Sequence, residues 1–347
     1  MREAVLLVGG QGTRLRPLTL TTPKPLLPVA GLPFLTHQLA ALRQAGVEHV
    51  VLATSYRAEV FADTFGDGSS LGLRLTYLHE EQPLGTGGAI RNASAGLTSE
   101  ADDPVVILNG DVLSGHNLAA QIDAHVTRDA DVTLHLVEVD DARAYGCVPT
   151  DDDDRVTAFL EKMENPVSSW INAGAYVFRR SVIDAIPAGQ VVSVERDTFP
   201  ELLASGRHVN AWKETAYWCD VGTPDALVRC SADIVLGVAP STAQQLAPAP
   251  AWWAEADRAQ VDAVVAGGST VGAGAVVEAG AVVEGSIIMP GARIGAQARV
   301  TRSVIGAGAV VGAGSEVSES AVADAAILAP GTVLTPGSRV EATGAQS

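Results

Sequence analysis

The chain has 347 residues and a net charge of −17, with 40 acidic against 23 basic side chains. This length favours two domains over a single core, and the negative charge argues against nucleic acid or an anionic membrane surface as a partner. Three cysteines without CxxC spacing argue against a disulfide framework or zinc site and favour a reduced, cytoplasmic protein. No apolar run reaches the roughly 18 residues that span a bilayer.

Residues 1–236 alternate short apolar runs with amphipathic stretches. The runs EAVLLV, VEHVVLA, LRLTYLH and PVVILN are predicted strands, and PFLTHQLAALRQAG is a predicted helix. This alternation predicts an α/β domain built on a mixed, mostly parallel sheet. Such sheets bind ligands beyond the carboxyl ends of their strands. The loops after Val8 and after Asn109 are therefore the first places to look for a site.

Residues 237–260 are rich in alanine and proline and lack a clear period, which indicates a linker. Its two tryptophans, Trp252 and Trp253, are expected to dock it against another part of the molecule. Residues 261–347 have a regular repeat, because β-branched and leucine side chains recur in steps of six, six and five.

Each position of this repeat returns after 17 residues, as in Val271, Ile288, Ile305 and Val322. The period predicts a parallel β-helix of hexapeptide repeats, in which each coil is a triangle of short strands. One apolar side chain per face points inward and stacks on the next coil. About four coils fit the length.

The segment VGGQGTRLRPLT, residues 8–19, contains three glycines and two arginines. It lacks the third glycine of the GxGxxG dinucleotide motif, and no Gly-Lys-Ser/Thr follows as in a Walker A loop. Its glycines allow backbone N–H groups to converge on an anion, and Arg14 and Arg16 add positive charge. The segment predicts a polyphosphate-binding loop, with a purely structural turn as the alternative.

Lys24 follows this loop and has a proline on each side. The prolines fix the backbone and limit where the ammonium group can point, a restraint that a solvated surface lysine does not need. Arg14 and Lys24 are therefore expected to clamp a triphosphate together, the arginine as a fork and the lysine as a point charge.

Nine motifs follow one another in the order GGQGTRLRPLT, PKPLLPVAG, EEQPLGTGGA, LNGDV, YGCV, FLEK, INAGAYVF, SVERDTFP and YWCDVGTP. This series resembles the sugar-1-phosphate nucleotidyltransferases, above all the actinobacterial members that use GTP and mannose 1-phosphate. The resemblance spans the whole chain, including the repeats. It implies a Rossmann-like catalytic domain at 1–236, a linker at 237–260 and a left-handed parallel β-helix at 261–347.

The implied reaction transfers a guanylyl group from GTP to mannose 1-phosphate, giving GDP-mannose and pyrophosphate. The sugar phosphate attacks the α-phosphorus in line and arrives ionised, so that no general base is required. A triphosphate and a monophosphate repel each other strongly at close range, and cations must therefore be fixed in the site. Mg²⁺ is the expected cofactor, because it prefers one or two carboxylates together with phosphate oxygens.

By the resemblance, Asp111 in LNGDV and Asp220 in YWCDVGTP hold the metal. A lone aspartate after a strand is more often a turn residue, but the presence of both aspartates in their motifs favours a role as metal ligands. The implied catalytic residues are Arg14, Lys24, Lys162 and Asp111.

In FLEK, the resemblance implies that Lys162 contacts the sugar phosphate and Glu161 the sugar hydroxyls. The alternative is an exposed ion pair worth less than about 1 kcal/mol. Met163 stands where the family usually has proline, which leaves the charged pair intact. Gly146 is expected to let the sugar approach the backbone, and the Asn172 amide to bind a hydroxyl.

For the base, the resemblance points to QPLGTGGA. Gly85 and Thr86 offer backbone and hydroxyl groups to the purine edge, and Gln82 and Asn109 reach the base or ribose. A helix cap is an equally natural interpretation of Thr86. The other expected nucleotide-binding residues lie in the first loop: Leu7, Gly9, Gly10, Gln11, Gly12 and Thr13.

The acidic run at residues 151–154 is interpreted as a hairpin turn rather than a metal site, because it separates two short extended runs. The seven histidines are scattered along the chain, so that no histidine-based catalytic constellation is evident.

Alternatives of other classes stay open. A regulatory paralogue would bind GDP-sugar without turnover, but it should have lost part of the cation set, which is complete here. An acyltransferase β-helix would need a general base, usually histidine, and the last histidine is His208, before the linker. The same chemistry with dTTP or ATP and glucose 1-phosphate, or with GTP and a cyclitol phosphate, is compatible with the spacing. The β-helix is expected to be an assembly or regulatory element, and the protein to be a homo-oligomer that uses it.

Overall fold

The computed structural model describes residues 1–55, 57–160, 162–244, 252–255 and 259–342. The chain forms two compact units. The first contains Met1–Gly10 and Gln38–Trp218, and the second contains Gln11–His37 and Cys219–Ser347. Helix α1 (Phe34–Gln44) crosses the boundary between them. The segment that follows the first glycines therefore belongs with the C-terminal part of the chain, and the domain limits expected from the sequence stay a prediction.

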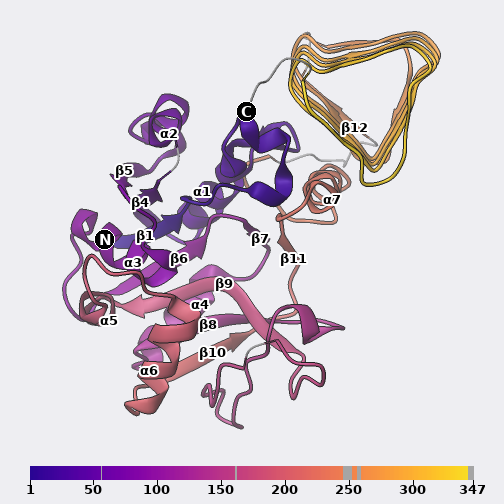
Figure 1. Ribbon diagram of the computed structural model, residues 1–347. Helices are drawn as coiled ribbons and strands as arrows, with labels where there is room; N and C mark the ends of the chain where they lie inside the picture. The colour runs from indigo at the N-terminus through magenta and orange to yellow at the C-terminus, as the bar shows by residue number, and fades with distance from the viewer. Residues whose placement is uncertain (56, 161, 245–251, 256–258, 343–347) are drawn as a thin grey trace. The chain divides into compact units, whose positions relative to one another are not determined.

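The first unit is built on a seven-stranded sheet with the strand order β10-β8-β9-β6-β1-β4-β5 (Figure 1). Strand β9 is antiparallel to both of its neighbours, and the other adjacent strands are parallel. The predicted mixed, mostly parallel sheet is thus confirmed. Its strands are β1 (Arg2–Leu7), β4 (Val47–Thr54), β5 (Arg74–His79), β6 (Pro104–Asn109), β8 (Val132–Glu138), β9 (Trp170–Arg179) and β10 (Val209–Lys213).

The apolar runs of the sequence form these strands because helices cover the sheet and bury their side chains. In β1, for example, Ala4, Val5 and Leu6 are all fully buried.

None of the helices in the described part of the chain is long and apolar enough to cross a membrane. The unit also contains α2 (Ala58–Phe65), α3 (Gly85–Ala93), α4 (Leu118–Thr127), α5 (Arg180–Ala185) and α6 (Phe199–Ala204), the short turns η4 (Ser69–Leu71), η5 (Ser94–Gly96) and η6 (Ala142–Ala144), and the π-helical turn η7 (Val194–Thr198).

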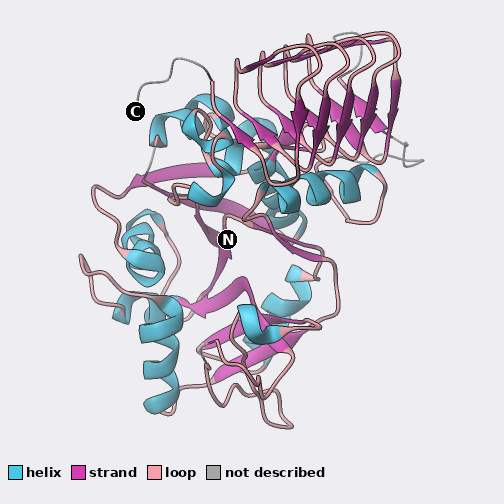
Figure 2. Cartoon of the chain, turned by 45° about the vertical axis from the view of Figure 1, so that its right-hand side comes forward, coloured by secondary structure: helices cyan, strands magenta, loops and turns pink. Residues whose placement is uncertain are grey.

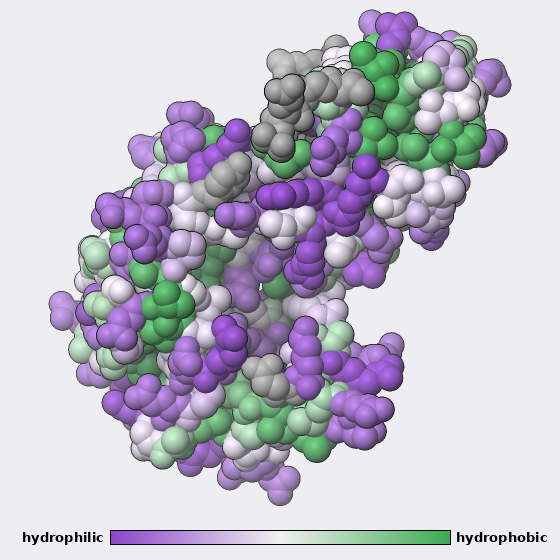
Figure 3. Space-filling view, viewed as in Figure 1, coloured by the Kyte–Doolittle hydropathy of each residue, from purple (hydrophilic) through white to green (hydrophobic). Residues whose placement is uncertain are grey.

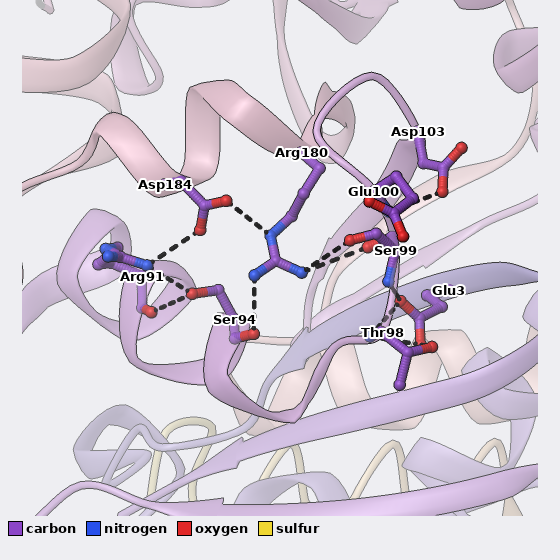
Figure 4. Close-up of polar contacts among 9 residues, drawn as sticks. All are labelled: Glu3, Arg91, Ser94, Thr98, Ser99, Glu100, Asp103, Arg180 and Asp184. Atoms are coloured by element: carbon purple, nitrogen blue, oxygen red, sulfur yellow. Dashed lines mark hydrogen bonds and ion pairs between the residues drawn. The ribbon is translucent and has the colours of Figure 1, made fainter.

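A buried carboxylate at the start of β1 anchors the sheet to the segment after η5 (Figure 4). Glu3 accepts hydrogen bonds from the backbone N–H groups of Thr98 and Ser99, and it pairs with the His49 ring at 2.6 Å. Burial opposes ionisation of Glu3, but the hydrogen bonds from His49, Thr98 and Ser99 outweigh it and lower its pKa to about 2. Arg180 of α5 reaches the same segment through Ser99.

The second unit begins with three 3₁₀ turns, η1 (Thr13–Leu15), η2 (Leu18–Leu20) and η3 (Lys24–Leu26), and a small hairpin of β2 (Pro28–Val29) and β3 (Leu32–Pro33). Helix α7 (Pro224–Val235) packs against β2, and its Ser231 hydroxyl accepts a hydrogen bond from the Ala30 N–H at 2.9 Å. The Trp253 ring lies directly against Gly31. The expected docking of the tryptophans is therefore confirmed for Trp253.

The rest of this unit is a parallel β-helix, which is triangular in Figure 1 and shows its stacked strands in Figure 2. Three parallel sheets of six, five and five strands form its faces. The sheets are β12-β15-β18-β21-β24-β27, β13-β16-β19-β22-β25 and β14-β17-β20-β23-β26. Val271, Ile288, Ile305 and Val322 stack in register, as the 17-residue period predicts.

The strands of the β-helix are short, as a hexapeptide repeat requires. They are β12 (Trp252–Ala254), β13 (Gln260–Val261), β14 (Val264–Ala266), β15 (Ser269–Val271), β16 (Val276–Val277), β17 (Val282–Glu284), β18 (Ile287–Ile288), β19 (Arg293–Ile294), β20 (Arg299–Thr301), β21 (Val304–Ile305), β22 (Val310–Val311), β23 (Glu316–Ser318), β24 (Ala321–Val322), β25 (Ile327–Leu328), β26 (Val333–Leu334) and β27 (Arg339–Val340).

The prediction of about four coils was too low. In the described part of the chain, sheets of six, five and five strands make five complete coils and one further strand. The first strand, β12, lies within the range expected as a linker and pairs in parallel with β15. Tryptophan does not belong to the valine, isoleucine and leucine pattern from which the repeat was recognised.

A ladder of serines at one corner also went unrecognised in the sequence. The hydroxyls of Ser269, Ser286 and Ser303 each accept a hydrogen bond from the backbone N–H of the serine 17 residues later. These side chains are buried, and the ladder satisfies backbone groups that would otherwise lack partners at the corner.

Candidate active site

The glycine-rich loop of residues 8–19, here called the signature loop, continues into the second unit from Gln11 and folds back on itself around Gly12. This glycine has a φ of +60°, and an added Cβ would lie 3.0 Å from side-chain atoms of both Lys24 and Thr19. The Thr19 hydroxyl donates to the Gly12 carbonyl oxygen at 2.9 Å. Only glycine combines this backbone conformation with so close an approach. The loop therefore brings Lys24, which is 9% exposed at the start of η3, next to Gly12.

Arg14 lies over the turn that follows strand β11 (Trp218–Asp220). Its Nη2 is 3.9 Å from Oδ2 of Asp220, and a Cβ on Gly222 would come within 2.6 Å of the same nitrogen. Glycine at 222 thus leaves room for the guanidinium group. The Arg14 side chain is 64% exposed, so this ion pair is weak and the fork can still engage an anion.

In the first unit, the loops after β1 and β6 meet at one edge of the sheet. Leu7 and Asn109 are paired in register at the ends of these strands, and the Gly110 N–H donates to the Leu7 carbonyl oxygen at 3.0 Å. The Ser55 hydroxyl holds the Gly9 carbonyl oxygen. Asp111 follows directly after Gly110. The two loops that the sequence singled out therefore lie side by side at the carboxyl ends of parallel strands.

The predicted metal ligands are Asp111 in the first unit and Asp220 in the second. Within the described residues, no group of three or more His, Cys, Asp or Glu side chains is placed to hold a metal. A donor set of carboxylates alone suits Mg²⁺, which binds through one or two carboxylates and completes its shell with phosphate oxygens and water.

An open pocket of about 500 Å³ lies at the start of α3, lined by Gly85, Thr86, Ser193, Glu195 and Arg196. The hydroxyls of Thr86 and Ser193 each donate to Oε2 of Glu195 at 3.1 Å, which orients the carboxylate. The structure thus brings two expected base-binding residues together with three that sequence reasoning missed. Their signal was the motif SVERDTFP, which carried the resemblance but received no role.

The capping interpretation of Thr86 is wrong. Helix α3 already begins at Gly85, so Thr86 lies within its first turn. Its hydroxyl instead accepts a hydrogen bond from the Val194 N–H at 2.9 Å and donates to Glu195. Gln82, two residues before the helix cap at Leu84, is exposed.

The expected sugar-binding motifs also converge in the first unit. Cys147, next to Gly146, and Leu160, next to Glu161, exchange backbone hydrogen bonds of 3.1 and 3.0 Å. These segments share a small apolar cluster with Ala173 and Trp218. YGCV, FLEK and INAGAY are therefore neighbours in space. Lys162 is exposed, and Glu161 lies outside the described residues.

The Asn172 side chain is held in a fixed orientation. Its Nδ2 donates to the Tyr176 hydroxyl at 2.9 Å, and its Oδ1 accepts from the Gly174 N–H at 3.0 Å. Burial raises the pKa of Tyr176, so this hydroxyl stays protonated at neutral pH. The side chain of Asn109 also bonds to Tyr176. Two of the predicted ligand-binding amides are thus linked through one buried tyrosine.

The acidic run at residues 151–154 forms the predicted turn. Thr150 and Val156 make an antiparallel bridge on either side of it, and Oδ1 of Asp151 accepts from the backbone N–H groups of Asp153 and Arg155. The first carboxylate of the run is therefore used in shaping the turn.

Comparison with known proteins places the chain in a family. A family model described as nucleotidyl transferase matches residues 3–235, and one described as GMPPB C-terminal domain matches residues 255–342. The chain belongs to the nucleotidyl transferase family and is an enzyme of the nucleotidyltransferase class. Members of this family generally use a divalent metal.

The curated relatives are named as guanylyltransferases. Over 242 residues, the chain is 58% identical to mannose-1-phosphate guanylyltransferase of Mycobacterium tuberculosis, a match that covers 70% of this chain and 67% of the relative. It is 39% identical over 223 residues to the catalytic subunit beta of the Drosophila melanogaster enzyme, covering 64% of this chain and 60% of that one. The chain thus spans about three fifths of the length of the fly protein.

The structure also resembles a solved one. HddC from Yersinia pseudotuberculosis, crystallised in a complex with GMP-PN, has a TM-score of 0.58 and 29% sequence identity, covering 67% of this chain and all of that protein.

Proposed function

We propose that this chain transfers the guanylyl group of GTP to mannose 1-phosphate and releases GDP-mannose and pyrophosphate. The names of its relatives support the substrates. Its own residues supply the charges that this chemistry needs. Arg14 lies in the glycine-rich loop and Lys24 follows it, Lys162 follows the sugar-pocket segment, and Asp111 and Asp220 provide the carboxylates. A regulatory paralogue would not have to keep all five.

In this mechanism Arg14 holds the β- and γ-phosphates as a fork and Lys24 adds a point charge. Lys162 binds the sugar phosphate and orients its oxygen in line with the α-phosphorus. Asp111 and Asp220 would hold Mg²⁺, which would supply positive charge to offset that of the phosphates. The protein moves no proton in the transfer step, because the attacking phosphate is already ionised.

Guanine is proposed as the base because the carboxylate of Glu195 lies beside Gly85 and Thr86. An ionised carboxylate only accepts hydrogen bonds. Guanine presents two adjacent donors, N1–H and the 2-amino group, whereas adenine has an acceptor at N1 and thymine a single donor between two carbonyls. The bonds from Thr86 and Ser193 hold Glu195 toward the pocket. We propose that Glu195 pairs with the guanine edge.

A substrate panel tests the proposed function. GTP, ATP, dTTP and UTP are each combined with mannose 1-phosphate, glucose 1-phosphate and a cyclitol phosphate in the presence of Mg²⁺, and pyrophosphate release is followed. GTP with mannose 1-phosphate is expected to give the highest kcat/KM. A higher value for ATP or dTTP with every sugar would contradict the guanylyl assignment. Turnover with no pair would support the regulatory alternative.

Glu195→Gln is expected to raise the KM for GTP by about 10- to 100-fold, because an amide donor then faces the guanine donors in place of an acceptor. The KM for mannose 1-phosphate should change little. The matched control is Glu201→Gln, which changes an exposed carboxylate on the following helix α6. If both variants keep the wild-type preference for GTP over ATP, the base is read elsewhere.

The proposal also covers the cellular compartment and the oligomeric state of the enzyme. Cys147, Cys219 and Cys230 are free thiols, which favours the cytoplasm. The surface of the β-helix carries hydrophobic areas, drawn green in Figure 3, and Val264, Ile327 and Val333 on this unit are exposed. Such side chains support self-association through the β-helix as a homo-oligomer.

A further inference from the structure

The last strand of the β-helix reaches back to the signature loop. Nη1 of Arg339, on β27, donates to the carbonyl oxygen of Arg14 at 2.6 Å and also to that of Arg16. These residues are more than 320 positions apart in the sequence but belong to the same unit. One guanidinium group therefore holds the main chain on both sides of Leu15, which is fully buried.

A second contact joins the same two segments. The Thr21 hydroxyl donates to Oδ2 of Asp324 at 2.5 Å. The aspartate is itself anchored, because its Oδ1 accepts from the Ala307 N–H in the preceding coil at 2.7 Å. The loop and the residues just after it are thus held at two points by groups of the β-helix. Two separate side chains of the β-helix, one basic and one acidic, contribute to this attachment.

The packing of the β-helix does not account for an arginine at this position. In the register of its sheet, Arg339 continues the column Ile287, Val304 and Ala321, whose side chains are buried. Arg339 itself is exposed. The last step of the column is 18 residues instead of 17, from Ala321 to Arg339. The guanidinium group of Arg339 instead donates to the carbonyl oxygens of Arg14 and Arg16.

We propose that Arg339 is a positioning residue for nucleotidyl transfer. By holding the carbonyl oxygens of Arg14 and Arg16, it determines where the Arg14 side chain leaves the backbone and keeps its guanidinium over the turn from Asp220 to Gly222. The inference rests on the proposed role of Arg14 in binding the triphosphate. It gives the β-helix a part in the reaction, although its described residues include no proposed ligand-binding group.

The expected effect is moderate because the contact is exposed and acts through geometry. Misplacing a catalytic group by about 1 Å costs up to about 100-fold in rate, and a loop that still has its Thr21 contact should lose less. Arg339→Ala is therefore expected to lower kcat/KM for the nucleotide by about 10-fold, with the KM for the sugar phosphate and the thermal midpoint nearly unchanged. Arg339→Lys, which can still donate to both carbonyl groups, should recover most of the loss.

The decisive experiment is a double-mutant cycle in the full-length enzyme. Arg339→Ala, Arg14→Ala and the double variant are compared with wild type, and Arg299→Ala, an exposed arginine of strand β20, is the matched control. If Arg339 acts through Arg14, its replacement should change kcat/KM by less than about twofold once Arg14 is absent. The control should resemble wild type.

The possible outcomes separate this inference from the proposed function. Equal effects of Arg339→Ala with and without Arg14, or no effect in either background, would overturn the positioning role. If Arg14→Ala has the same kcat/KM as wild type, both the role of Arg14 and this inference are overturned. The assays use the best substrate pair from the panel, so an unexpected nucleotide would contradict the proposed function and leave the cycle interpretable.

Discussion

Asp220→Asn and Asp111→Asn are each expected to lower kcat by at least about 1,000-fold, which corresponds to about 4 kcal/mol of transition-state stabilisation. Asparagine has nearly the shape of aspartate, but it removes a negative charge from a donor set that consists of carboxylates. Metal affinity and the neutralisation of phosphate charge should both fall. The measurement is pyrophosphate release over a range of Mg²⁺ concentrations.

The fold should survive both substitutions, because neither side chain belongs to the apolar core. Circular dichroism and the thermal midpoint check this. Asp225→Asn is the matched control, since Asp225 is an exposed aspartate in the first turn of α7, close to Asp220 in the sequence. Near-normal turnover of the Asp111 or Asp220 variant, with a normal Mg²⁺ dependence, would refute the metal assignment.

Arg14→Ala is expected to lower kcat/KM for GTP by about 100- to 1,000-fold, the size of effect seen when one preorganised charge donor is removed from a transition state. Both kcat and the KM for GTP should be affected, because the leaving pyrophosphate carries more charge in the transition state than in the bound nucleotide. Arg14→Lys keeps the charge but loses the forked geometry of the guanidinium group. Its kcat/KM for GTP should therefore lie between those of wild type and Arg14→Ala.

Arg43→Ala is the control for this series, because Arg43 is an exposed arginine at the end of α1. Steady-state kinetics with GTP varied at saturating mannose 1-phosphate give the two parameters separately. A change in KM alone would mean that Arg14 contributes only ground-state binding. Unchanged values of both parameters would exclude Arg14 from the phosphate site.

The fold was largely predictable because its signals are periodic. The buried run PVVILN became β6 with Asp111 just beyond its end, and the 17-residue recurrence of Val271, Ile288, Ile305 and Val322 became one stacked column. Both patterns follow from the geometry of a strand and a coil. The first coil was missed because Trp252 and Trp253 do not fit the aliphatic pattern, and the serine ladder because only apolar positions were aligned.

The charged residues of the candidate site could be predicted from the sequence, but the contacts between its distant segments could not. Motif order pointed to Arg14, Lys24, Asp111, Lys162 and Asp220 without any coordinates. Glu195 had no assigned role, because nothing in SVERDTFP indicates that η7 approaches the start of α3. Thr86 was open to two interpretations, and the exact first residue of α3 excluded one of them.

By itself, the sequence determined the alternation of strands and helices, the coil period and the residue types that meet phosphate and metal, because each depends on spacing along the chain. Only the tertiary structure decided which distant segments touch. Arg339 reaches the carbonyl oxygens of Arg14 and Arg16, and Glu195 lies beside Thr86. Such contacts depend on how complete elements pack, and a hydrogen bond across hundreds of residues leaves no period in the sequence.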